Sequence, residues 1–208
     1  RLQVNGFRVG VARRDEWARV ADALGERGAR PLKTSVMVVL PGRPITVPLG
    51  RSEEPAAVFS FRADGTLEGT DLPPGDTALS LNITPATGVA DRLRVAALPQ
   101  LRTLHDQTHF VKEREGFALQ RAPKVISLYP LAWDMTVTGR DFLVVGPGGD
   151  SRRASSPGHH FLLHEFEDRL FETLLVFAPR IDTTEPAGGQ SGDAGFLELP
   201  QAPPAPTP

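Results

Sequence analysis

The chain has 208 residues, of which 40% are hydrophobic, and its formal net charge is −2. This hydrophobic fraction is enough for a folded core, whereas the near-neutral charge excludes the basic surface that binding to nucleic acid requires. The absence of cysteine excludes disulfide bonds, cysteine-ligated metals and thiol nucleophiles. With 20 glycines and 20 prolines, the composition disfavours a helical bundle and favours short elements joined by turns.

The N-terminal part of the chain predicts a strand followed by a helix. Apolar residues alternate with polar or small ones over residues 2–12, which is the period of a strand, and an irregularity is expected near Gly6. Residues 13–24 predict an amphipathic helix with Trp17 as a core anchor. Its apolar face is formed at helical spacing by Trp17, Val20, Ala21 and Leu24.

Most of the remaining chain predicts strands arranged in hairpins. Residues 34–40 and 45–49 are predicted strands on either side of a Pro-Gly turn, and an Asp-Gly turn joins residues 58–61 to Leu67. Residues 77–84 are expected to pair with residues 92–101. The polar stretch 104–115 predicts either a loop or a solvated hairpin. Further strands are predicted at residues 117–119, 132–137, 141–146, 160–163 and 169–179.

These elements predict a mainly β fold with one or two helices (α+β), in which residues 1–182 form one β-rich domain. Residues 183–208 contain six prolines and predict a Pro/Gly-rich C-terminal arm or tail. Only residues 195–199 of this arm are apolar, and they are expected to add a strand or to dock on a neighbour. Composition by itself favours the alternative, a disordered linker.

A cluster of histidines is the first candidate for chemistry. His159, His160 and His164 form an HHxxxH pattern, whereas a zinc protease needs HExxH with the glutamate between its ligands. Here Glu165 follows the last histidine. In a strand, His160 and His164 would share a face but lie about 13 Å apart, too far to bind one ion. We therefore interpret them as exposed or rim histidines.

No other pattern predicts a catalytic, cofactor-binding or metal-binding residue. The chain has no Gly-x-Ser-x-Gly elbow, and the glycines at residues 146–149 open no predicted helix that would cradle a phosphate. We therefore predict that the protein is not an enzyme and that it has no cofactor and no small-molecule ligand. Trp133, beside Pro130 and Asp134, is considered as an exposed interface residue.

The order of several segments resembles the C-terminal domain of secretins, the ring-forming module of bacterial type II and type III secretion channels. The family has a helix, a strand, a short turn and a second strand closing on glycine, to which residues 17–50 are similar. Further strands of the family are matched by residues 79–85 (LSLNITP), 92–101 (RLRVAALPQL), 135–137 (MTV), 142–146 (FLVVG) and 173–181 (TLLVFAPRI). The match covers about residues 7–182.

The resemblance implies a secretin-like β domain in a bacterial cell envelope, in the periplasm or at the outer membrane. It further implies a non-enzymatic role in type II secretion and protein transport. The expected partners are other copies of the chain, forming a ring or pore, or other envelope proteins. A soluble β-rich adaptor or binding module without a channel is the alternative, and a hydrolase that uses His160 or His164 is a third hypothesis.

Overall fold

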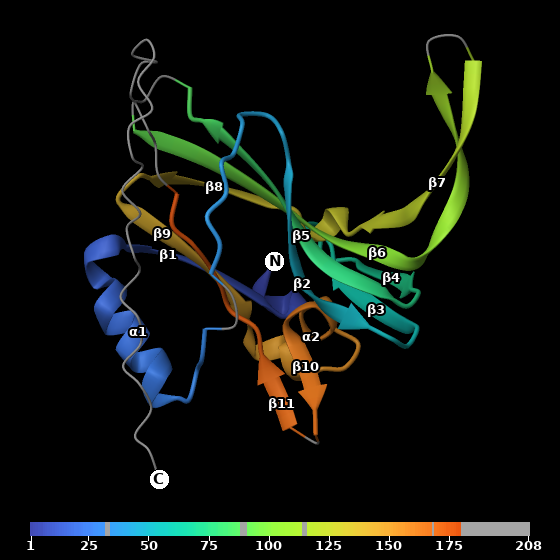
Figure 1. Ribbon diagram of the computed structural model, residues 1–208. Coiled ribbons are helices and arrows are strands. Elements are labelled where there is room, and N and C mark those ends of the chain that lie inside the picture. The colour runs from blue at the N-terminus through green and yellow to red at the C-terminus, as the bar shows by residue number, and fades with distance from the viewer. Residues whose placement is uncertain (32–33, 88–90, 114–115, 168, 180–208) are drawn as a thin grey trace, which may run out of the picture.

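The computed structural model describes residues 1–31, 34–87, 91–113, 116–167 and 169–179. These residues form a mainly β protein, as the sequence predicts, and all of their strand pairing is antiparallel (Figure 1). The predicted C-terminal arm, residues 183–208, lies outside the described residues.

The first strand is shorter than the sequence predicts, because the chain begins with a single helical turn. Residues Gln3–Asn5 form a 3-10 helix that ends at Gly6, whose φ of +82° is left-handed. Strand β1 follows as Phe7–Arg13. The predicted irregularity at Gly6 is confirmed, since glycine adopts this φ without the steric cost that other residues pay.

The predicted helix is confirmed. A 3-10 turn at Arg14–Glu16 leads into α1, Trp17–Glu26, and Gly28 follows with a φ of +77°. Trp17 packs edge-on against Phe142, with ring centroids 5.3 Å apart. However, Trp17 is half-buried and no residue of α1 is fully buried, so the expected core anchor lies at the margin of the core.

The largest sheet has the order β2-β5-β6-β7, with β8 pairing the first part of β6. Its strands are β2 (Ile45–Ser52), β5 (Gly75–Pro85), β6 (Arg92–Glu113), β7 (Gly116–Ser127) and β8 (Trp133–Thr138). The predicted pairing of residues 77–84 with 92–101 is confirmed, with Ile83 opposite Val95. Alternation buries Leu79 and Leu81 on the inner face of β5.

The polar stretch after residue 104 is a hairpin rather than a loop. Strand β6 continues to Glu113, and β7 returns along it with Asp106 opposite Pro123 and Glu113 opposite Gly116. A register irregularity between Arg102 and Asp106 precedes this part. Beyond it the hairpin curves away from the other strands as a projecting arm (Figure 1).

Three smaller groups of strands accompany the main sheet. The predicted Asp-Gly hairpin is confirmed as β3 (Ala56–Phe61) and β4 (Leu67–Leu72). Strand β9 (Asp141–Pro147) lies between β1 and β12 (Leu175–Phe177) in a three-stranded sheet. Side chains of the main sheet and of this three-stranded sheet meet in one core. This core includes Phe7, Leu81, Leu101, Leu143 and Phe161.

The prediction of a strand at residues 160–163 is wrong. Residues Pro157–Leu162 form the short helix α2 instead. The Ser156 hydroxyl accepts a hydrogen bond from the His159 amide, and Pro157 occupies the first helical position. These are helix start signals, and the fully buried Phe161 and Leu162 hold the helix against the core.

The single predicted strand at residues 169–179 is also wrong, because the structure divides it. Residues Arg169–Glu172 form β11, which pairs with β10, Leu163–Phe166. The chain then crosses at Thr173, whose amide donates to the Leu162 carbonyl, and joins β9 as β12. The apolar run at residues 169–179 therefore contributes strands to two different sheets, and its composition alone does not reveal this division.

The predicted strand at residues 34–40 is wrong as well. The turn after it forms, since the Arg43 amide donates to the Leu40 carbonyl at 3.1 Å and Gly42 has a φ of +77°. Only β2, on the far side of the turn, enters a sheet. The apolar composition favours a strand, but no edge within the described part of the chain pairs with this segment.

Candidate functional site

The three histidines of the HHxxxH pattern do not converge on one point. His159 and His160 lie in α2, where their rings pack edge to face with centroids 5.5 Å apart, whereas His164 lies in β10. His159 Nδ1 donates to the Ser151 carbonyl at 3.1 Å. Within the described residues, no group of three or more His, Asp or Glu side chains is placed to hold a metal ion.

His160 and His164 are partly buried rather than exposed, and this affects their protonation. Burial lowers the pKa of both below the ordinary value of 6.5. The charge of His159 lowers the pKa of His160 further, while a hydrogen bond to the Leu49 backbone opposes the shift of His164. Both rings are therefore held neutral by their surroundings, which fits a packing role.

The His164 ring packs against Gly50 of β2. A Cβ built on Gly50 would lie 2.1 Å from His164 Cε1, so the ring occupies the space of a side chain. Thr77 is the register partner of Gly50 on β5 and is fully buried. Neither Thr77 Oγ1 nor His164 Nε2 has a hydrogen-bond partner. The sequence contains no signal for this contact.

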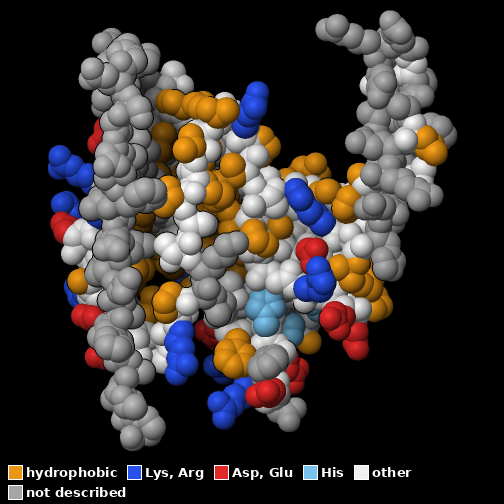
Figure 2. All heavy atoms as spheres, viewed as in Figure 1, with side chains coloured by type: hydrophobic (Ala, Val, Ile, Leu, Met, Phe, Trp, Pro, Cys, Tyr) orange, Lys and Arg blue, Asp and Glu red, His pale blue; other side chains and the backbone are white. Residues whose placement is uncertain are grey.

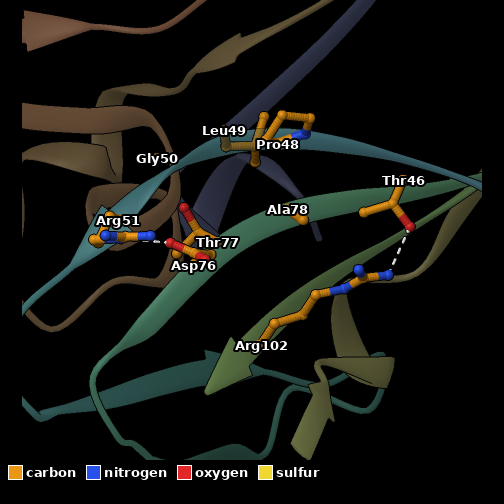
Figure 3. A pocket seen from close by; sticks show the side chains of 9 residues that line it. All are labelled: Thr46, Pro48, Leu49, Gly50, Arg51, Asp76, Thr77, Ala78 and Arg102. Carbon is orange, nitrogen blue, oxygen red and sulfur yellow. Dashed lines mark hydrogen bonds and ion pairs between the residues drawn. The ribbon is translucent and has the colours of Figure 1, made fainter. Parts of the chain in front are cut away.

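An open groove lies beside this contact, over strands β2, β5 and β6 (Figure 3). Two arginines cross it, and each already binds a neighbour. Arg51 Nε donates to Asp76 Oδ1 at 2.7 Å, and Arg102 donates to the Thr46 hydroxyl at 2.9 Å. The Arg51–Asp76 pair is half-exposed, and pairs of this kind contribute little to stability because water screens the charges. The groove thus has a mixed polar and apolar lining, and its lining residues include no nucleophile–base pair.

Trp133, considered above for an interface, and the nearby Tyr129 have different environments. Trp133 is only 8% exposed and belongs to the core, so the prediction of an exposed Trp133 is wrong. It starts β8 opposite Ala97 of β6, which turns its side chain to the buried face. Tyr129, four residues earlier, is 72% exposed.

Exposed apolar side chains are the most prominent surface feature of the described residues. They occur on the segment before β2 and on strands β11 and β12, and Figure 2 shows such side chains across the upper part of that view. A folded protein that leaves many of them uncovered commonly uses them for contacts with other chains. They include Val36, Val38, Leu40, Leu170, Phe171 and Val176.

The described helices include none with the length and apolar character to cross a membrane. Comparisons of the chain with protein-family models, with curated proteins and with solved structures give no match. The class of protein that the structure defines is therefore a mainly β protein with antiparallel sheets.

Proposed function

We propose that the chain is a non-enzymatic structural component of a bacterial envelope assembly, in the periplasm or at the outer membrane. In this proposal copies of the chain join in a secretin-like ring or pore. The observation that carries the proposal is the projecting β6–β7 hairpin (Figure 1). From Asp106 to Pro123 its strands pair only with each other among the residues that the structure describes. Because an isolated two-stranded hairpin is marginally stable in water, contact with another chain supplies the packing it lacks.

Unpaired strand edges support the same proposal. In the three-stranded sheet β9 is central, so β1 and β12 each have an edge without a partner strand among the described residues. Strand β7 forms a further edge, since it pairs with β6 alone. An edge strand presents unpaired backbone groups, and pairing between identical copies satisfies them.

The resemblance to secretins is the reason for proposing a ring in the bacterial envelope rather than any other oligomer. Of the segments that carry the resemblance, residues 79–85, 92–101, 135–137 and 142–146 lie within β5, β6, β8 and β9. Their order along the chain is the order in which the family uses them. With no match in the comparisons, the envelope location depends on these segments alone.

The test is the mass of the particle in solution. Size-exclusion chromatography with light scattering should give a discrete multiple of the 22.5 kDa chain, and negative-stain microscopy should show closed rings. A particle that stays monomeric at micromolar concentration and above overturns the proposal. Open filaments would retain self-assembly but overturn the ring, because a head-to-tail contact closes only at a suitable rotation.

A shortened hairpin tests the feature that carries the proposal. Replacing residues 106–123 by an Asn-Gly turn removes the projecting part and keeps the pairing of Arg102 with Val125. We expect a folded monomer with an unchanged near-UV spectrum. The matched control is Tyr129→Ala, which alters an exposed side chain outside the hairpin and should assemble normally. Unimpaired assembly of the shortened chain would show that the hairpin does not make the contact between copies.

The alternative, a soluble adaptor or binding module without a channel, is favoured by the exposure of Tyr129. A bulky aromatic side chain that is 72% exposed is typical of contact residues at interfaces. This alternative predicts a monomer that retains a protein partner from the envelope fraction of its source. Tyr129→Ala should then weaken retention, whereas in the ring proposal it leaves assembly unchanged.

A further inference from the structure

Residues 34–40 form an apolar segment without a structural role inside the described chain. The sequence Thr-Ser-Val-Met-Val-Val-Leu has no charge, proline or glycine. Val36 is 83% exposed and Val38 is 90% exposed, while Met37 is 48% exposed and Val39 is half-buried. This alternation is that of an extended strand, with every second side chain directed to solvent.

The backbone of this segment is unpaired as well. Besides the Leu40 carbonyl, which closes the turn to Arg43, no backbone group of residues 34–40 bonds to any other part of the described chain. Native proteins usually protect such a stretch with charges, prolines or a covering element. Residues 34–40 contain no charge and no proline, so their sequence leaves the segment open to pairing with another strand.

A free edge of matching length lies elsewhere on the same molecule. Strand β1, Phe7–Arg13, pairs with β9 over its whole length, and no strand of the described residues pairs with its other edge. The segment 34–40 also has seven residues, so it can pair along all of β1. At the centre of β1, Gly10 has open space where a Cβ would point, and Val11 is 44% exposed. Valines on both strands would then be buried together.

We propose that residues 34–40 become a strand paired with the free edge of β1 in a second copy of this chain. This inference rests on the proposed self-assembly and names two surfaces that take part in it besides the β6–β7 hairpin. Strand addition supplies hydrogen bonds through the backbone and burial through alternate side chains. The donated strand is residues 34–40 and the acceptor edge is β1. Because these are different surfaces, each copy donates one strand and accepts one from another copy. Such a head-to-tail contact propagates into a ring when its rotation closes.

Charged substitutions test the donor strand. In Val36→Lys/Val38→Lys two side chains that point to solvent become charged, so the isolated fold should keep its circular dichroism spectrum. We expect the concentration needed for assembly to rise at least about tenfold, which corresponds to about 1.4 kcal/mol. The matched control is Leu170→Lys on β11, which is 53% exposed, and it should assemble as the unaltered chain does.

Disulfide trapping tests the identity of the acceptor edge, and the cysteine-free chain gives no background. A Val38→Cys chain is mixed with a Val11→Cys chain that carries a longer affinity tag, so the mixed dimer has its own mass. In a parallel pairing over the full length of both strands, position 38 lies opposite position 11. We expect the mixed disulfide in this arrangement, since directly paired residues have Cα atoms within bonding distance. A mixture of Leu170→Cys with the same Val11→Cys chain should remain monomeric under denaturing conditions.

The outcomes separate this inference from the proposal it rests on. If the unaltered chain assembles and the double lysine variant assembles equally well, the donor strand is wrong while self-assembly stands. If assembly is lost but the mixed disulfide does not form, β1 is not the acceptor and the inference fails. If the unaltered chain is monomeric, both the inference and the proposed function are overturned.

Discussion

The His164 ring lies where a Gly50 side chain would be, with His164 Cε1 2.1 Å from the ideal Cβ position. This contact links β10 to β2, two elements that are distant in sequence. It requires a glycine for space and not for backbone conformation, since Gly50 is not among the glycines with positive φ. The contact thus fixes how the β10–β11 hairpin packs against the main sheet.

Substitution of Gly50 by alanine should therefore destabilise the protein. The added methyl group clashes with the His164 ring, and overpacking of this kind costs about 1–3 kcal/mol. Urea unfolding followed by circular dichroism measures the loss. The control is Gly10→Ala, another strand glycine, where a Cβ meets nothing within 4 Å. Equal stability of Gly50→Ala and the unaltered chain would contradict the packing of His164 against Gly50.

A double variant tests whether His164 itself causes this loss. In Gly50→Ala/His164→Ala the small side chain at position 164 removes the clash, so the two free-energy changes should not add. We expect a shortfall of at least about 0.5 kcal/mol relative to their sum. Strict additivity, measured in the same urea series, would show that the cost of alanine at position 50 has another origin.

The stability of the protein should fall in mildly acidic solution. Burial lowers the pKa of His160 and His164 below 6.5, so the unfolded chain binds protons that the folded protein does not. This contribution is fully present above about pH 6.5 and is lost as the pH falls towards the depressed values. Free energies of unfolding at pH 7.5 and pH 5.5 measure it. In His160→Gln/His164→Phe the decrease in the free energy of unfolding between pH 7.5 and pH 5.5 should be smaller. An unchanged decrease would show that these two histidines do not cause it.

Asn5 should contribute to stability through its side-chain amide. Its Oδ1 accepts from the Phe61 amide at 2.7 Å, and its Nδ2 donates to the Phe61 carbonyl at 3.0 Å. Asn5 is fully buried, so Asn5→Ala leaves backbone groups of β3 without partners, at about 2–3 kcal/mol. Asn5→Asp keeps the acceptor and loses the donor, and it is the variant for comparison. A loss below about 0.5 kcal/mol for alanine would contradict this role.

Trp17 should anchor α1, but less strongly than a fully buried tryptophan. Its ring packs on Phe142, which is 2% exposed, while Trp17 itself is half-buried. We expect Trp17→Ala to cost about 1–3 kcal/mol, below the range for fully buried aromatic residues. Tyr129→Ala, at a side chain that is 72% exposed, should change stability by less than about 0.5 kcal/mol. Thermal and urea unfolding compare the two variants.

Local sequence was sufficient to predict an element where the residue types strongly favour one backbone conformation. The turn at Gly65, with a φ of +82°, and the helix from Trp17 follow from glycine geometry and apolar periodicity. The α2 helix was missed although Ser156 and Pro157 are start signals, because the neighbouring apolar residues are equally typical of a strand. None of the side-chain contacts at Gly50 or Asn5 has a local signal, since their partners are distant in sequence.

From the amino-acid sequence alone come the scarcity of long helices, the positions of most hairpins and the absence of cysteine chemistry. Glycine, proline and alternating apolar residues impose these locally. Only the tertiary structure decided which strands found partners. Residues 34–40 and 45–49 both have strand composition, yet only the second pairs, because β5 offers it an edge. The positions of the 20 glycines and 20 prolines set where the chain turns. Which neighbour each strand pairs with depends on which other strands have an unpaired edge within reach.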